Sequence, residues 1–431
     1  MTPSRTDFRQ AIAGRRDWAV SLLADMVRHP TVLGQEESGQ LHLAGVFDSL
    51  GYATHVEPID INRIKNLPGF SPVDWELHGK KNVVAVHDPG GKAGRTLAFN
   101  SHIDVVSPEP VSLWSSPPFE PRIIHGGPDG EDWMAGRGAG DMKGGAVAYL
   151  LALAALQDMG LEPASAVICQ SPVEEECTGN GTLAILERGH LTDACIIPEP
   201  FNETLLTAQV GVMWFQVRIL GKTTHVLGAG RGVNAIEKSW VIIQALRELE
   251  AEINRPEAIP DTFADIEHPI NLNVGVIGGG DWASTVAGEC VTRFRIGLFP
   301  GQRCEEMKRR IEACVHETAQ GDPWLKEFPP TVEYVGFQAE GCTLDLANDF
   351  GATLRGAHRD WRGAPIDEYK CTCTTDVRFF QLYHDIPTTC YGPKATDIHG
   401  VDEKVSLDSI VRVAEVMATF IERWCGLQRR R

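Results

Sequence analysis

Hydrophobic positions in the first half of the chain switch repeatedly between helical and strand spacing. Helical spacing over residues 6–28 places one apolar stripe along Phe8, Ile12, Val20, Leu23 and Val27. Short apolar runs then predict strands at 53–59, 82–86, 96–99, 166–173 and 194–197, and helices at 144–158 and just after Gly181. Continuous apolar strands that alternate with helices indicate an α/β domain with a mostly parallel sheet.

The pattern changes after about residue 208. Residues 210–225 (VGVMWFQVRILGKTTH) begin with a long alternating strand, followed by a helix at 234–254, strands at 271–277 and 290–298, and a helix at 302–319. This order resembles a small α+β sandwich. We therefore predict a first domain part at 1–207, an inserted domain at 208–326, and a second part at 327–431 that begins with a strand at 331–335 and ends with a helix at 405–424.

Composition narrows the class of protein. A chain of 431 residues with 43% hydrophobic and 23% charged residues has the composition of a globular protein with two or three domains. The 40 basic and 58 acidic residues give a net charge of -18. This balance argues against nucleic acid or an anionic membrane surface as the main partner, and it suits a protein that binds cations.

Location is predicted from the apolar runs and the cysteines. The first thirty residues interleave charged and apolar positions, and the longest apolar run, 146–156, is too short to cross a bilayer, so we expect neither a signal peptide nor a membrane span. The 11 cysteines are scattered, and only Cys371 and Cys373 lie close together, at a spacing unlike that of zinc fingers. These features predict a protein of the reducing cytoplasm.

Polar clusters at the ends of apolar strands carry the candidate chemistry. In SHIDVV, His102 and Asp104 share one face of an extended segment, which suits a ligating histidine and a carboxylate that orients it. In GRGAGDMKGG, glycines present Asp141 at the mouth of the next helix. A strand-end histidine beside a capping aspartate, and an aspartate at a helix N-cap, are the alternatives.

Three further clusters complete the candidate site. PVEEECTGNGT places Glu174, Glu175 and Glu176 in a row, an arrangement that repels itself unless a cation or solvent compensates, so a solvated acidic turn is the alternative. Glu199 in IIPEP ends an apolar strand, and His399 in TDIHGVDEK lies in a polar loop. Mixed histidine and carboxylate sets suit zinc or similar divalent metals, and a shared carboxylate permits a two-metal centre.

These five motifs, in this order, resemble the aminoacylase/acetylornithine-deacetylase/succinyl-diaminopimelate-desuccinylase family of co-catalytic metallopeptidases. The resemblance covers nearly the whole chain and includes the segment WSSPPFEP. It implies an α/β metallopeptidase domain with an inserted α+β dimerisation (lid) domain, and the segment around 67–81 looks like the acetylornithine-deacetylase branch.

The resemblance also implies a role for each residue of the motifs. His102 and Glu199 would bind one metal, Glu176 and His399 the other, and Asp141 would bridge both, with the cis peptide that the family often has after this aspartate. Asp104 would orient His102. Gly181 sets the register that makes Glu175 the general base and Glu176 a ligand, although a register of Glu174 and Glu175 stays open.

The inserted domain would contribute substrate contacts. His225, in GKTTHVLGAGRGVNAI, is similar to a family histidine that reaches the partner subunit's active site and stabilises the oxyanion. Asn273 resembles a residue of the lid near the substrate, and the arginine expected there is Arg293 or Arg295. Arg378, on a predicted helix, resembles arginines that contact a substrate carboxylate, and a solvated helical charge is the alternative.

We therefore expect a cytoplasmic, homodimeric, dimetal amidohydrolase that removes an acyl group from an N-acylated amino acid or related small amine. Zinc is the expected metal, with cobalt and manganese as alternatives. A dipeptidase, carboxypeptidase, deformylase or deaminase could use the same metal centre, because variable loops set the substrate. A non-catalytic protein that binds a small molecule is the alternative from a different class.

Overall fold

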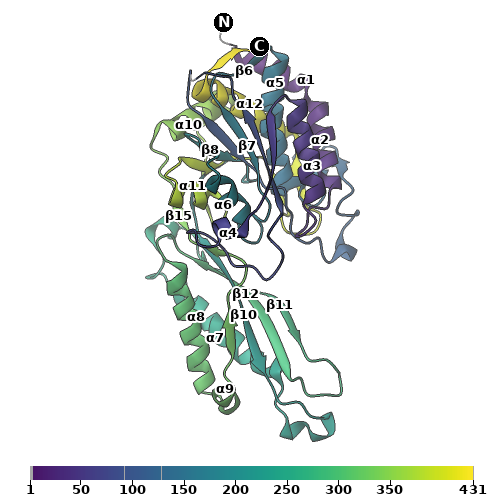
Figure 1. Ribbon diagram of the computed structural model, residues 1–431, viewed down its shortest axis with the longest axis vertical. Helices are drawn as coiled ribbons and strands as arrows, with labels where there is room; N and C mark the ends of the chain where they lie inside the picture. The colour runs from purple at the N-terminus through teal and green to yellow at the C-terminus, as the bar shows by residue number, and fades with distance from the viewer. Residues whose placement is uncertain (1–2, 92, 128, 431) are drawn as a thin grey trace.

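The computed structural model describes residues 3–91, 93–127 and 129–430. Figure 1 shows an elongated molecule in two parts, with both chain termini at the outer end of the upper part. The upper part is a sheet covered by helices, and the lower part is a smaller sheet with its own helices. We call the upper part the main domain and the lower, inserted part the lid domain.

A six-stranded mixed sheet forms the centre of the main domain. Its order is β1 (Ala53–Pro58), β2 (Lys81–His87), β7 (Val167–Ser171), β3 (Leu97–Asn100), β8 (Cys195–Ile197) and β17 (Thr388–Cys390). The four strands from β7 to β17 are parallel, whereas β1 and β2 run antiparallel at one side. The expected α/β fold is confirmed, and the parallel strands bring their carboxyl ends to one edge.

Helices cover both faces of this sheet. The side chains of β2, which point alternately to the two faces, accordingly belong to two different cores. Val83 and Ala85 belong to the large core of the main domain, whereas Val84 packs against Ile168 and against Ile185 of α6. The helices of the main domain are α1 (Arg5–Gly14), α2 (Arg16–Arg28), α3 (Glu37–Ser49), α4 (Ile61–Ile64), α5 (Gly145–Asp158), α6 (Asn180–Glu187), α10 (Asp349–Arg362), α11 (Val377–Tyr383) and α12 (Leu407–Cys425).

Helix α5 is the most buried helix of the large core. Within the described residues, the stretch Ala139–Asp158 is long and apolar enough to cross a membrane, but 94% of its most apolar window is buried inside the protein. It contacts α1, α2 and α12. Its apolar composition therefore serves the packing of the core.

The single helix expected at 6–28 is two helices. Helix α1 ends at Gly14 and α2 begins at Arg16, with the backbone of Arg15 outside helical geometry between them. Glycine is a weak helix former, so a break beside Gly14 costs little. The turn lets Phe8 and Ile12 of α1 and Leu23 of α2 each reach the core.

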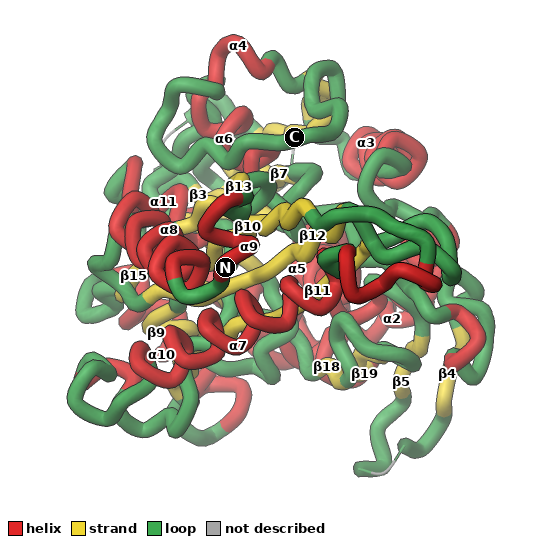
Figure 2. Tube along the Cα trace, turned by 90° about the horizontal axis from the view of Figure 1, so that it is seen from below, coloured by secondary structure: helices red, strands yellow, loops and turns green. Residues whose placement is uncertain are grey.

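The lid domain is a sheet with helices on one face (Figures 1 and 2). Its strands run in the order β11 (Leu272–Gly279), β12 (Glu289–Leu298), β10 (Gly211–Leu220) and β13 (Thr331–Glu333), and β14 (Gln338–Ala339) also pairs with β10. Helices α7 (Ala235–Ile253) and α8 (Cys304–Gln320) contact each other, and α9 (Pro323–Glu327) follows α8. A separate hydrophobic core fills the space between sheet and helices.

The predicted limits of the lid domain shift in the structure. The strand expected to return the chain to the main domain at 331–335 pairs with β10 instead, as does β14, so the return lies near Gly341 rather than at 327. The outward crossing lies at Val210, since β9 (Leu205–Gln209) still pairs within the main domain. The spacing of apolar residues predicts a strand but does not say which sheet it joins.

Small sheets of the main domain hold the loops around its edge. They consist of β15 (Cys342–Thr343), β9 and β16 (Glu368–Cys371); of β18 (Ala395–Thr396), β19 (Lys404–Ser406), β5 (Trp133–Ala135) and β4 (Arg122–Ile124); and of β20 (Leu427–Arg429) and β6 (Leu161–Pro163). Because β18 and β19 pair with each other, the loop that carries His399 between them is closed at its base.

Candidate metal centre and substrate cleft

His102 lies just beyond the carboxyl end of β3 and is buried. Its Nδ1 lies 2.9 Å from the backbone carbonyl oxygen of Asp104, and its Nε2 lies 3.2 Å from Oδ1 of Asp141. Asp104 therefore orients this ring through its main chain. Its carboxylate lies 3.8 Å from Nδ1 and instead accepts the backbone N–H groups of Glu175 and Glu176.

Asp141 sits in a glycine turn before α5 that a buried carboxylate holds in place. Glu403 accepts the backbone N–H groups of Gly138, Gly140 and Asp141, and the guanidinium of Arg137 at 2.5 Å. The Asp141–Met142 peptide bond is cis. Sequence reasoning missed Glu403, because a glutamate beside a polar loop has no signal that separates it from a surface charge.

The acidic triplet divides between two environments. Glu174 is fully buried and pairs with Lys80 at 2.7 Å, while the indole N–H of Trp75 donates to the same oxygen. Glu175 lies 3.8 Å from His102 Nε2, and Glu176 lies 3.0 Å from Nε2 of His399. The structure thus brings Glu175 and Glu176 to the cluster and leaves Glu174 outside it.

Asp141 lies between the two histidines. Its Oδ1 faces His102 at 3.2 Å, and its Oδ2 faces Nε2 of His399 at 3.3 Å. Glu199, two residues after β8, lies 3.8 Å from His102 on the other side. All five predicted ligands and Glu175 therefore gather at the carboxyl edge of the parallel strands.

The electrostatics of this cluster are those of a crowded acidic site. Burial, the largest cause, and neighbouring carboxylates raise the pKa of Glu175 and of Glu199 well above the usual value. Burial alone would lower the pKa of His102, but the hydrogen bond to Asp141 and nearby carboxylates raise it well above its ordinary value. The charge of Glu176 raises the pKa of His399 to about 12.

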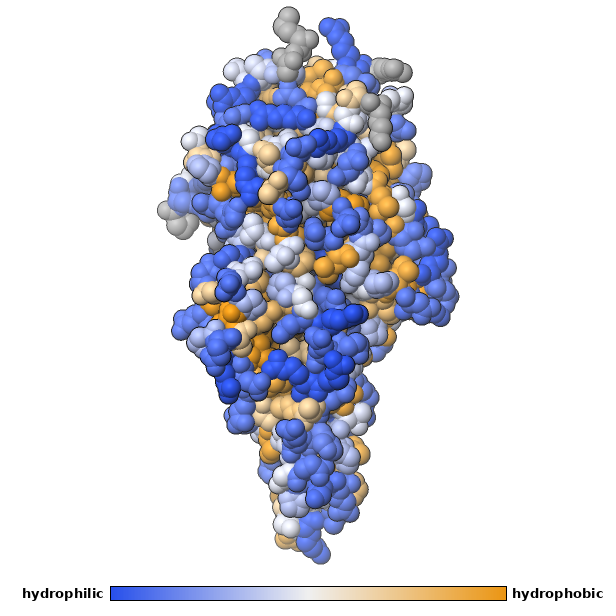
Figure 3. All heavy atoms as spheres, turned by 90° about the vertical axis from the view of Figure 1, so that its left-hand side faces the viewer, coloured by the Kyte–Doolittle hydropathy of each residue, from blue (hydrophilic) through white to orange (hydrophobic). Residues whose placement is uncertain are grey.

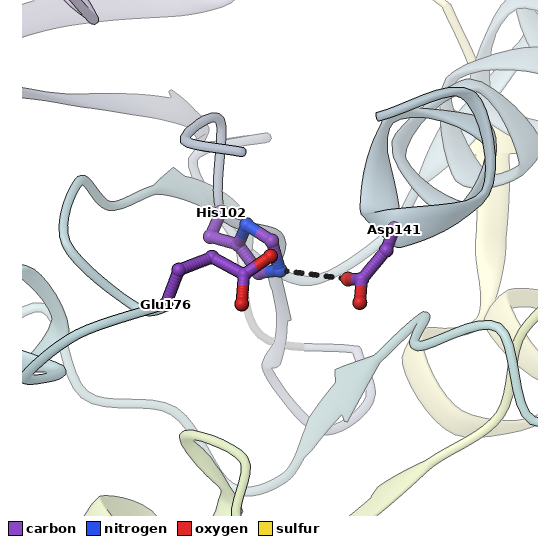
Figure 4. A group of neighbouring side chains, drawn as sticks. All are labelled: His102, Asp141 and Glu176. Atoms are coloured by element: carbon purple, nitrogen blue, oxygen red, sulfur yellow. Dashed lines mark hydrogen bonds and ion pairs between the residues drawn. The ribbon is translucent and has the colours of Figure 1, made fainter. Parts of the chain in front are cut away.

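These residues fit divalent metal ions. Two groups, His102 with Asp141 and Glu176, and His102 with Glu175 and Glu199, each hold their ligand atoms within 4.8 Å of one another. Figure 4 shows His102 and Glu176 turned toward Asp141. Oε1 of Glu176 is buried without a hydrogen-bond partner among the described residues. Cations would supply the charge that so many close carboxylates require, and imidazole with carboxylate is the donor set of zinc and similar metals.

A cleft of about 610 Å³ opens beside the cluster, between the main and lid domains. Asn273 of β11 and Arg295 of β12 are opposite each other in the lid sheet and both line this cleft. Arg293 lines it as well and lies 3.8 Å from Asp74. Arg295 donates to the carbonyl oxygen of Thr372, which joins the lid domain to the main domain.

Arg378 is not brought to the cleft. It lies on α11 as expected but is fully buried, donates to the carbonyl oxygen of Thr178 at 2.7 Å, and stacks over the ring of Phe379. It is neither a substrate contact nor a solvated charge, because it supports the turn that follows the acidic triplet. Sequence spacing placed it on a helix but could not show which way the helix faces.

His225 also lies outside the cleft of its own chain. It follows β10, is exposed, and caps a short turn by accepting the backbone N–H of Leu227. Trp214 of β10 lines the cleft, and the six residues from there to Leu220 span roughly 20 Å of extended strand. His225 is thus remote from the metal ligands of its own subunit.

All 11 cysteines are free in the part of the chain that the structure describes. Cys373 is exposed and lines the cleft, with its sulfur 2.7 Å from that of the buried Cys371. The remaining cysteines are buried, apart from the partly exposed Cys314. The pair places a thiol at the wall of the cleft, a feature that the sequence spacing did not predict.

Comparison with known proteins agrees with this geometry. The model of Peptidase family M20/M25/M40 matches residues 98–423. The N-formyl-4-amino-5-aminomethyl-2-methylpyrimidine deformylase of Halalkalibacterium halodurans is 29% identical over 377 residues, with 82% of this chain and 86% of that protein covered. The succinyl-diaminopimelate desuccinylase of Paracoccus denitrificans is 27% identical over 419 residues, with 94% and 97% covered.

A solved structure shows the same fold over the full length. A di-peptidase from Saccharomyces cerevisiae superposes with a TM-score of 0.79 at 16% identity, and 99% of each chain is covered. At this identity the likeness establishes the arrangement of main and lid domains, and it carries no statement about the substrate.

Proposed function

We propose that this protein removes an acyl group from an N-acylated amino acid or related small amine. The chain belongs to Peptidase family M20/M25/M40, because the model of that family matches more than half of it, and it hydrolyses amide bonds. The observation that carries the proposal is Asp141, which lies between His102 and His399 with Glu175 beside them. The cluster contains no serine, threonine, cysteine or lysine, the usual nucleophiles of acyl-enzymes, so water is proposed as the attacking group.

Two divalent cations are proposed as cofactors, with zinc first and cobalt or manganese as alternatives. His102 and Glu199 would hold one cation, Glu176 and His399 the other, and Asp141 both. When bound, such ions lower the pKa of water and polarise a carbonyl oxygen. The carboxylate of Asp104 accepts hydrogen bonds from the backbone N–H groups of Glu175 and Glu176, and these bonds hold the acidic turn against the cluster.

Glu175 is proposed as the general base. Its carboxylate takes the proton of the attacking water and later gives it to the leaving nitrogen, so the amine departs neutral. Its neighbour Glu174 is neutralised by Lys80 and held by Trp75, so Glu175 alone of these two is free to exchange protons at the cleft.

A second candidate is a deformylase, which differs in the acyl group. Two of the similar curated proteins carry that name, at 29% and 28% identity. The di-peptidase resemblance rests on fold alone and favours peptide substrates less. A non-catalytic binding protein is disfavoured because an unused cluster of buried carboxylates would destabilise the fold.

A homodimer in the cytoplasm is proposed as the working form, with His225 acting on the partner's cleft. The distance of His225 from its own cleft supports this arrangement.

Figure 3 shows mainly hydrophilic residues on one side of the molecule, with scattered hydrophobic patches. Large apolar side chains are exposed on the lid domain, namely Leu227, Trp240, Val276 and Trp282. A partner that covers these side chains would remove apolar surface from water, which favours association. The free cysteines suit a reducing compartment.

The test combines metal analysis with a substrate screen. The purified protein, loaded in turn with zinc, cobalt or manganese, is assayed on N-acetyl, N-formyl and N-succinyl amino acids and on small formamides, with Glu175→Gln as the control. We expect release of free amine by the wild type at two metals per chain. Full metal loading without hydrolysis of any acyl compound would overturn the proposal.

A further inference from the structure

One wall of the cleft is built from aromatic side chains that come from three separate segments. Trp75 comes from the segment before β2, Trp214 from β10 and Phe337 from the residues just before β14, and all three line the cleft that also holds Glu175 and His399. We call these three residues the aromatic wall. It has no part in the acid–base steps proposed above.

A hydrogen bond to a buried carboxylate anchors the indole of Trp75. Its indole N–H donates to Oε1 of Glu174 at 2.8 Å, and Lys80 pairs with the same oxygen and with Glu36. Glu174 is fully buried, so this arrangement satisfies both the carboxylate and the indole. A side chain at position 75 that kept only the bulk of the indole would leave Oε1 of Glu174 with Lys80 but without the N–H donor.

The segment that carries Trp75 is also tied to the segment that carries Phe337. The backbone N–H of Gly336 donates to the carbonyl oxygen of Pro72 at 2.8 Å, and that of Gln338 donates to the hydroxyl of Ser71 at 3.0 Å. Because these bonds flank Phe337, the two segments move together. These bonds therefore hold the backbone on both sides of Phe337 against the segment that leads to Trp75.

Trp214 and Phe337 meet edge to face, with ring centroids 5.4 Å apart and ring planes at 85°. Gly336 makes this contact possible, since a Cβ there would lie 2.4 Å from the indole of Trp214 and its φ is +84°. The backbone N–H of Trp214 also donates to the carbonyl oxygen of Phe337. Both residues line the cleft while their rings pack on each other.

We propose that the aromatic wall is a subsite for a flat aromatic ring carried by the substrate beside its scissile amide, with Trp75 as the residue that determines this preference. Ring-on-ring contacts favour aromatic groups beyond the apolar area that they bury, and a puckered ring of the same size cannot make them. The inference rests on the proposed amide hydrolysis but concerns binding alone. It names the chemical class of the substrate, which the metal centre leaves open.

The ring can lie on the amine side or on the acyl side of the amide, and matched substrates separate the two. N-formylbenzylamine is compared with N-formylcyclohexylmethylamine, and N-benzoylglycine with N-cyclohexanecarbonylglycine. The first pair differs only in a flat against a puckered six-membered ring. In the second pair conjugation with the ring also makes the benzoyl carbonyl less electrophilic, so this pair is compared through KM. We expect kcat/KM in the first pair, or KM in the second, to favour the flat member by about 3- to 10-fold.

Two variants at position 75 test the residue. In Trp75→Leu the flat-to-puckered ratio should fall toward 1, because the ring proposed to determine the preference is gone and only Trp214 and Phe337 remain. In Trp75→Phe the ratio should stay within about twofold of wild type, because a ring remains. Its kcat should fall for every amide alike, since the hydrogen bond to Glu174, next to the base, is lost.

Trp324 supplies the matched control. Its indole is also partly buried and also donates at 2.8 Å, to the carbonyl oxygen of Leu220, but it lies in α9 at the far end of the lid domain (Figure 1). Trp324→Leu should leave the flat-to-puckered ratio at the wild-type value. A ratio that falls equally in Trp324→Leu and Trp75→Leu would overturn the assignment to Trp75.

The outcomes separate the subsite from the proposed function. Hydrolysis with equal kcat/KM within the first pair and equal KM within the second overturns the subsite and leaves amide hydrolysis standing. If no amide is hydrolysed, calorimetry of the metal-loaded protein compares benzylamine with cyclohexylmethylamine and benzoate with cyclohexanecarboxylate. Tighter binding of a flat member that Trp75→Leu abolishes supports the subsite and overturns the proposed function, and equal or absent binding overturns the subsite.

Discussion

The carboxylate of Asp104 accepts the backbone N–H of Glu176 at 3.1 Å and thereby anchors the acidic turn beneath His102. Its other oxygen accepts the N–H of Glu175 at 3.3 Å. One aspartate thus fixes the proposed base and a proposed ligand through their main chains, while its own carbonyl oxygen lies 2.9 Å from Nδ1 of His102.

Asp104→Asn should lower activity and metal affinity by about 10- to 100-fold, because an amide group would replace an acceptor that faces an N–H donor. The measurements are kcat/KM and metal content after dialysis. Asp88→Asn, at an exposed aspartate after β2, is the control and should match wild type. Wild-type metal affinity in Asp104→Asn would show that the turn is held by other contacts.

Glu175→Gln and Glu176→Gln should separate proton transfer from metal binding. The first should keep metal content near wild type while kcat falls by about 10²-fold or more, since only the proton carrier is removed. The second should lose metal, because Glu176 faces His399 at 3.0 Å. Metal analysis of both variants decides the roles. The reverse pattern would mean that the proposed roles within the triplet are exchanged.

Glu403→Gln should destabilise the protein by about 3 kcal/mol, because it leaves the buried guanidinium of Arg137 without a counter-charge. It should also weaken metal binding, since Glu403 accepts the N–H of Asp141. Urea unfolding and metal titration check the two effects. Glu317→Gln, at an exposed position of α8, should change neither.

Mixing of two inactive homodimers tests the proposed action of His225 on the partner. His225→Ala and Glu175→Gln should each be nearly inactive, and subunit exchange should restore up to roughly a quarter of wild-type activity in a random mixture under two-fold pairing. That quarter comes from heterodimers in which one cleft has both residues. Exchange that is verified by mass spectrometry but restores nothing would place His225 within its own chain or outside the reaction.

At alkaline pH, Cys373 should be the first cysteine to react with iodoacetamide, because it is exposed while the others are buried or partly buried. Alkaline pH is needed because the hydrogen bond with Cys371 raises the pKa of the Cys373 thiol well above its ordinary value. Cleavage after Lys370 and Arg378 yields a tryptic peptide, 371–378, that contains Cys373 and Cys371 and no other cysteine. Mass spectrometry of this peptide gives the labelling rate. A ligand that fills the cleft should slow it, and first labelling at Cys314 would contradict the exposure of Cys373.

The sequence predicted the parts of this protein that depend on local pattern. Apolar spacing located the parallel strands β3, β7 and β8 but not β17, and it located α5 and α7. Polar residues after strands pointed to His102 and Glu199, and a glycine-rich turn before a helix pointed to Asp141. Contacts between distant segments could not be predicted in this way. Glu403 resembles any surface glutamate until the fold buries it against Arg137, and Arg378 faces inward because of how α11 packs.

The same limit explains the errors at the domain limits. A strand at 331–333 carries no mark of its partner, and in the structure it pairs with the edge of β10 that faces away from β12. The acidic triplet could be placed in a turn, yet only Lys80 and Trp75, about a hundred residues earlier, show that Glu174 faces away from the cluster.

The two connections between the domains touch at Gly211 and Gly341, where a Cβ on the first would lie 2.6 Å from the backbone nitrogen of the second. Because the two connections lie this close together, a rotation of the lid domain would have to pivot where they meet. β10 starts at this pivot and extends roughly 30 Å from it along its ten residues. A rotation of the lid domain by about 10° would therefore move the far end of β10 by roughly 5 Å. Trp214, three residues from the pivot, would move by roughly 2 Å. Alanine at either glycine would push the two connections apart at this pivot, because its Cβ would lie 2.6 Å from the backbone nitrogen of the other glycine.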